Sequence, residues 1–106
     1  MATFEDRGKG IEAGFMHELE LRFKITSRRN YMAGLWAAKH MGLTGEAADT
    51  YAKSVVLAEL DRGGDKNVIE KMVADLTAKG HQVTAAQVQF ELEHFAATAK
   101  KQVMQE

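Results

Sequence analysis

The chain contains no proline, and glycine supplies all of its strong helix stops. Three such stops stand out, at Gly42, at Gly63-Gly64 and at Gly80. Each follows a stretch with helical spacing of apolar residues, which is where a glycine in the left-handed conformation commonly ends a helix. The stops divide the chain into four segments, so the sequence predicts four helices with short connections.

A residue suited to cap a helix N-terminus follows each stop. Thr44 follows the first, and Asp65 is the expected N-cap of a helix over residues 66–79. Thr84 and Gln87 have the spacing of a capping box, in which each side chain bonds the other residue's backbone N–H. The sequence thus predicts three helix starts, of which the last is the best determined.

Between these boundaries the apolar residues recur with helical spacing. The stripes after residue 44 are Ala48, Tyr51, Ala52, Val55 and Val56; Ile69, Met72, Val73 and Leu76; and Val88, Leu92, Phe95, Ala96, Ala99 and Val103. Upstream of Gly42, a longer helix is marked by Ile25, Met32, Leu35 and Trp36, with Trp36 as a core anchor. We expect an all-α fold, in which residues 21–106 form a four-helix bundle of roughly antiparallel neighbours and residues 1–20 form a flexible N-terminal segment.

Composition limits the function classes. The 106 residues, 45% apolar and 27% charged, suit one globular domain. A net charge of −1 gives no basic excess for nucleic acid, and no apolar run is long enough for membrane insertion. There is no cysteine and no secretory signal, so we expect a cytoplasmic location.

The first twenty residues combine an apolar stripe with poor helix formers. Phe4, Ile11 and Phe15 keep a helix-like spacing, while three glycines interrupt it: Gly8, Gly10 and Gly14. Each glycine costs about 1 kcal/mol relative to alanine in a helix. Two interpretations stay open, a segment that becomes helical against a partner and a frayed chain end; the residues alone favour the second.

No catalytic or metal-binding motif is found. The histidines lack the spacing of a helix-face metal site: they are His17, His40, His81 and His94. Residues 61–65 lack the ligands of a calcium loop, and no serine or threonine has a nucleophile motif around it. We expect no metal, no cofactor and no enzymatic activity.

A basic cluster lies on the long first helix, formed by Arg22, Lys24, Arg28 and Arg29. Glu18 and Glu20 stand four residues before Arg22 and Lys24, as in ordinary helix ion pairs. We therefore interpret the cluster as part of a structural helix with one basic face that is free to meet an acidic partner, and not as a nucleic-acid site.

Short blocks spread over nearly the whole chain form a recognisable signature. The most specific runs from Arg28-Arg29-Asn30 to Gly34-Leu35-Trp36-Ala37-Ala38. The others are Phe4-Glu5-Asp6-Arg7, Glu12, Phe15, Glu18-Leu19-Glu20, Phe23-Lys24, Gly42-Leu43-Thr44-Gly45, Tyr51-Ala52-Lys53, Val55-Val56, Gly64-Asp65, Gln102-Val103-Met104 and Glu106. Together they resemble the alphaproteobacterial ATP synthase inhibitor zeta-subunit family.

The resemblance implies a regulator that is a monomer when free. Its N-terminal segment becomes helical as it wedges between an alpha and a beta subunit of the F-type ATP synthase catalytic head, with gamma as a further candidate contact. ATP hydrolysis is blocked and synthesis is much less affected, at the inner membrane's cytoplasmic side. The implied contacts are apolar at Phe4, Ile11 and Phe15 and polar at Asp6, Arg7 and Glu12. The first-helix signature is Phe23, Arg28, Arg29, Asn30, Leu35 and Trp36.

The three N-terminal glycines depart from the family, which usually has better helix formers there. Their combined cost of a few kcal/mol could weaken binding by a factor of about a hundred or more. The glycines therefore keep one alternative open, a helical interaction module for another protein partner. A separate alternative is a regulator that binds nucleotide weakly between its helices.

Overall fold

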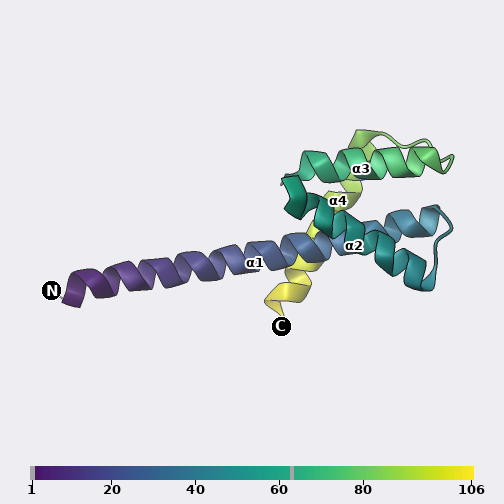
Figure 1. Cartoon of the computed structure of the whole chain (residues 1–106). Coiled ribbons are helices and arrows are strands. Elements are labelled where there is room, and N and C mark those ends of the chain that lie inside the picture. Colours follow the sequence, from purple (N-terminus) through teal and green to yellow (C-terminus); the bar gives the residue numbers. More distant parts are fainter. Residues whose placement is uncertain (1, 63) are drawn as a thin grey trace.

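The computed structural model describes the backbone of residues 2–62 and 64–106 and the side chains of residues 14–60 and 64–106. Four helices are present (Figure 1): α1 is Ala2–His40, α2 is Gly45–Arg62, α3 is Asp65–Ala78 and α4 is Ala85–Met104. The described residues contain no strand. The predicted all-α, four-helix fold is confirmed.

The first helix has a free half and a packed half. Its N-terminal half projects from the other three helices, and the molecule is 64 Å long but only 25 by 22 Å across (Figure 1). The side chains of residues 14–20 are all exposed, whereas Leu21 and Ile25 are half-buried. The backbone of α1 passes residue 20 without a break, so the two halves differ in packing and not in secondary structure.

The predicted glycine stops are confirmed at the ends of α1 and α3. Gly42 and Gly80 have φ of 78° and 86°, the left-handed region that glycine adopts without strain. In both turns the glycine N–H donates to the carbonyl oxygen three residues earlier. The N–H of the next residue donates to the carbonyl oxygen five residues earlier, from Leu43 to Ala38 at 2.9 Å and from His81 to Leu76 at 3.0 Å. This pair of bonds is the Schellman motif.

Of the predicted starts, the capping box of α4 is confirmed and the N-cap of α3 is wrong. Thr84 Oγ1 accepts from the Gln87 N–H at 3.1 Å, and Gln87 Oε1 accepts from the Thr84 N–H at 2.8 Å. In α3, Gly64 is the N-cap and makes no side-chain cap, while Asp65 is the first helical residue. Its carboxylate is bonded to Arg29 of α1, so it does not cap its own helix.

The core is built from larger side chains on α3 and α4 and small ones on α1. The cluster of buried residues is Ala33, Ala37, Val55, Val68, Met72, Leu76, Val88 and Leu92. Trp36 packs against it, as expected for an anchor, but is only partly buried. Neighbours along the chain run roughly antiparallel up to α3, whereas α4 crosses α1, with which it is in contact (Figure 1). The prediction of antiparallel neighbours was therefore wrong for the last helix.

Candidate functional site

A buried polar network joins three helices in the packed half of α1. Arg29 Nη2 donates to Glu59 Oε1 of α2 and to Asp65 Oδ1 of α3, both at 2.9 Å. Arg29 Nε donates to Asn30 Oδ1 at 3.0 Å, and Asn30 Nδ2 donates to the same Glu59 oxygen at 3.0 Å. Asn30 is fully buried, and all buried side-chain nitrogen and oxygen atoms within the described residues have a partner. Arg29 and Asn30, both in the resembled signature, thus hold the bundle together.

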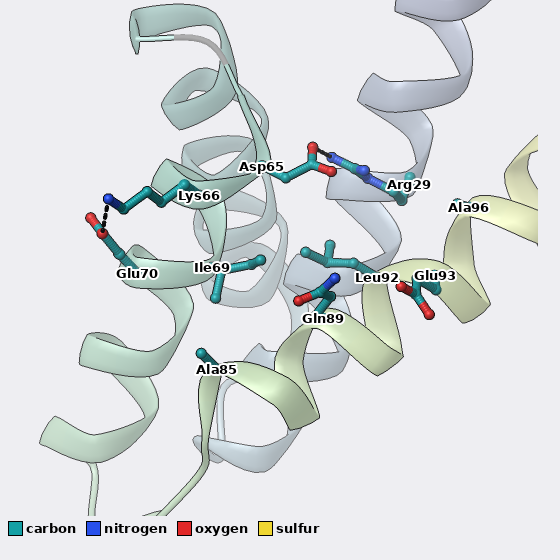
Figure 2. A pocket seen from close by; sticks show the side chains of 10 residues that line it. All are labelled: Arg29, Asp65, Lys66, Ile69, Glu70, Ala85, Gln89, Leu92, Glu93 and Ala96. Carbon is teal, nitrogen blue, oxygen red and sulfur yellow. Dashed lines mark hydrogen bonds and ion pairs between the residues drawn. The ribbon is translucent and has the colours of Figure 1, made fainter.

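An open cavity of about 450 Å³ lies beside this network, between α3 and α4 (Figure 2). Its two cations are already paired with carboxylates: Arg29 with Asp65 at 2.9 Å, and Lys66 with Glu70 at 4.0 Å. Its floor is apolar, with Ile69 and Leu92 among its lining residues. Both cations that line the cavity therefore already have a carboxylate partner. Neither is left unpaired to bind the phosphates of a nucleotide.

A second polar cluster lies where α1 leaves the bundle. Lys24 Nζ is 2.5 Å from Glu106 Oε1, and Arg28 Nη1 donates to Glu106 Oε2. The two cations, Arg28 above all, lower the pKa of the Glu106 carboxyl from about 4.5 to about 2. The expected pairing of Lys24 with Glu20 is thus replaced by a contact with residue 106, while Glu18 and Arg22 pair as expected, at 3.1 Å.

These contacts specify the interpretation of the basic cluster. All four of its cations are paired with carboxylates of the same chain. Arg29 is nearly buried and Arg28 only partly exposed, whereas the side chains of Arg22 and Lys24 are 71% and 51% exposed. The cluster is structural, as expected, and contact of its exposed part with an acidic partner stays a prediction.

An apolar row runs along the free half of α1. Phe15, Leu19 and Phe23 follow one another at i, i+4 spacing and are 59%, 39% and 56% exposed. At about 100° per residue, the same row continues in steps of three or four to Asn30 and Ala33, which are buried in the bundle. The helix face that packs the core therefore runs on, without a partner, along residues 15–23. We call Phe15, Leu19 and Phe23 the free row.

The free row only partly matches the residues that the sequence singled out. Phe15 was expected as an apolar contact, and Phe23 and Leu19 were named only within the signature blocks; the neighbouring exposed Met16 was not singled out. The i+4 register of Leu19 with Phe15 was the signal that could have identified Leu19 as a contact. Five expected contacts lie where the structure does not describe side chains: Phe4, Asp6, Arg7, Ile11 and Glu12.

The remaining signature residues lie at the far end of α1. Trp36 meets His40 edge to face, with ring centroids 4.9 Å apart, and Leu35 is exposed at the surface. The His81 ring is 6.2 Å from that of His40. The part of the chain that the structure describes contains no group of three or more metal-ligating side chains. None of its helices combines the length and the apolar character needed to cross a membrane.

The protein is a small helical bundle whose buried polar side chains, among the described residues, all have hydrogen-bond partners. One long face of α1 is left exposed. These features are typical of helical proteins that bind other proteins. The comparisons narrow the class. The chain belongs to the ATPase inhibitor subunit zeta family, whose sequence model matches residues 1–102.

A related structure, solved by solution NMR, has the same fold. It shares 36% sequence identity with this chain, superposes with a TM-score of 0.69, and covers 80% of this chain and 96% of its own. No curated protein matches the chain significantly.

Proposed function

We propose that the protein inhibits ATP hydrolysis by the F-type ATP synthase. In this proposal, residues 1–20 insert between an alpha and a beta subunit of the catalytic head, and the bundle stays outside. Membership of the ATPase inhibitor subunit zeta family supports the target. The free row supports the assignment of the N-terminal segment as the inhibitory part. One helix face packs the core at its C-terminal end and is exposed at its N-terminal end, so the exposed end is suited to bind in a groove.

Burial of the two free-row residues within this segment, Phe15 and Leu19, would contribute to the free energy of binding. Removing one Leu or Phe side chain fully from water contributes about 1.5–3 kcal/mol. These contributions offset part of the cost of association and of ordering the segment. Inhibition of this kind is stoichiometric and needs no cofactor, and it places the protein on the cytoplasmic face of the inner membrane through its partner.

One observation keeps a second candidate open, a helical interaction module that binds another protein through the same helix. Gly14 lies in the exposed half of α1 with no heavy atom within 4 Å of the position of a Cβ. Among the residues whose side chains are described, the glycine therefore has no packing reason, and it weakens the helix that the inhibitor needs.

The test is ATP hydrolysis by the cognate synthase, titrated with the full chain and with a chain that lacks residues 1–16. Inhibition by the full chain alone would support both the target and the working segment. Equal inhibition by the two chains would show that the bundle is the inhibitor. Absence of inhibition by either, at concentrations well above that of the enzyme, would favour the interaction module.

A further inference from the structure

At the point where α1 leaves the bundle, a single carboxylate binds two cations of the helix. Glu106 bonds Lys24 and Arg28, which stand one turn apart on α1. N-terminal to Lys24, the only described ion pair is the local one between Glu18 and Arg22. Among the described side chains, the Glu106 cluster is therefore the last polar link between the projecting helix and the bundle.

Glu106 is presented from an anchored turn. Val103, three residues earlier, is buried in the core, and its carbonyl accepts the Glu106 N–H at 3.2 Å. The carboxylate is thus placed against α1 by packing that is already formed. The backbone at Glu106 is therefore ordered before the two ion pairs form, and only the side chains of Glu106, Lys24 and Arg28 lose further conformational freedom.

The cluster does not use the face that the proposed function needs. At about 100° per residue, the row of Lys24 and Arg28 lies roughly 160° around the helix from the free row. The helix can therefore be held on one side while the apolar side chains on the other side stay available.

Orientation at this point has large consequences at the far end of the helix. The 22 residues from Ala2 to Phe23 extend about 33 Å at 1.5 Å per residue. A tilt of about 10° at Lys24 would move the end by roughly 6 Å, more than one helical turn's rise. Small changes at the base would therefore misalign the segment with a narrow groove.

We propose that Glu106 is a positioning residue, which fixes the direction of the projecting half of α1 through Lys24 and Arg28. The expected effect on inhibition rests on the proposed function, whereas the expected effect on the direction of the helix does not depend on it. Loss of the carboxylate would leave the bundle folded, because the core and the Arg29 network are untouched, but would widen the range of directions that the helix samples.

The direction of the helix can be measured in the full chain. Because the sequence has no cysteine, spin labels can be attached specifically at His17→Cys on α1 and Thr77→Cys on α3, both exposed. We expect Glu106→Gln to broaden the label-to-label distance distribution, while the lost ion pairs lower the melting temperature only slightly and the bundle stays folded. Glu70→Gln, which removes the same charge from an exposed pair on α3, serves as the matched control and should leave the distribution unchanged. An unchanged distribution in Glu106→Gln would overturn the proposal.

Inhibition of ATP hydrolysis is the second readout. Glu106→Gln should raise the half-maximal inhibitory concentration roughly three- to tenfold, the range expected for the loss of two exposed ion pairs. Combining Arg28→Glu with Glu106→Arg should restore both readouts in part, because the pair with position 28 forms again while Lys24 loses its carboxylate at position 106. A broadened distribution with full inhibition would refute the inhibitory consequence. If the unaltered chain does not inhibit, the proposed function fails, and the distance distributions still decide the role of Glu106.

Discussion

Gly34 of α1 lies against Ala52 of α2 so closely that a Cβ on Gly34 would stand 2.6 Å from the Ala52 Cα. The Ala52 Cβ and carbonyl oxygen are also within 3.3 Å of that position. Two helix backbones can come this close only where one of the two contacting residues is a glycine, which has no side chain. The contact therefore sets the spacing of α1 and α2.

Gly34→Ala should destabilise the bundle. The clashing atom belongs to the backbone, so the helices must separate, at a cost of about 1–3 kcal/mol that exceeds alanine's helix-propensity gain of about 1 kcal/mol. The free energy of unfolding in urea would measure the net loss. Gly14→Ala, which meets no neighbour, is the matched control and should not lower stability. Equal stability of both variants would show that α1 and α2 are not tightly packed.

The buried polar network predicts a rank order of destabilisation. Arg29 and Glu59 have side chains only 11% and 16% exposed, while that of Asp65 is 59% exposed. Arg29→Lys cannot keep all three of its bonds and should cost about 1.5–3 kcal/mol, whereas Asp65→Asn should cost about 1 kcal/mol or less. Chemical denaturation would check the order. A larger loss for Asp65→Asn would mean that its carboxylate has a further role in starting α3.

The fold was predictable where local chemistry decides it, and less so where distant residues meet. Thr84 and Gln87 act within one turn, so their capping box could be read from the chain. Asp65 follows the same local rule for an N-cap, but its carboxylate bonds Arg29, 36 residues away, which no local pattern reveals. The large apolar residues of α1 suggested its core face, yet the structure buries Asn30, Ala33 and Gly34 there, because close helix approach favours small side chains.

Candidate site residues were predictable only in part, for a related reason. The i+4 series from Phe15 is visible in the sequence. Whether its side chains are buried or exposed, however, depends on how far along α1 the helix α2 extends. Glu106 is separated from Arg28 by 78 positions, so its contact with the first helix comes from the crossing of α4 over α1. The expectation that residues 1–20 form a flexible segment stays a prediction.

The Glu106 cluster should respond to strong acid and not to pH changes near neutrality. Its cations lower the pKa of the carboxyl from about 4.5 to about 2, so the cluster's stabilisation is complete above pH 4.5 and is lost as the pH falls through about 2. The side-chain carboxyl resonance of Glu106, followed by NMR, should titrate near pH 2, well below the ordinary pKa of about 4.5. Titration near pH 4.5 would show that Lys24 and Arg28 do not hold Glu106 in solution.

Gly14→Ala should strengthen inhibition. Alanine lowers the cost of keeping α1 helical by up to about 1 kcal/mol, which corresponds to roughly a fivefold lower inhibitory concentration. Adding Gly8→Ala and Gly10→Ala should extend the gain. Helicity by circular dichroism and a hydrolysis titration would be measured together. Higher helicity with weaker inhibition would show that the partner packs against the glycines.

The free row should decide partner binding without affecting the fold. Leu19→Ser and Phe15→Ser each remove an exposed apolar side chain, so the melting temperature should change little. If these side chains are buried on the synthase, each loss of about 1.5–3 kcal/mol should raise the inhibitory concentration roughly ten- to a hundredfold. His17→Ser is the matched control, because it introduces the same residue on the other side of α1. Inhibition weakened as much by His17→Ser would mean that the segment binds through its helical propensity or its polar face, and the free row would then have another partner.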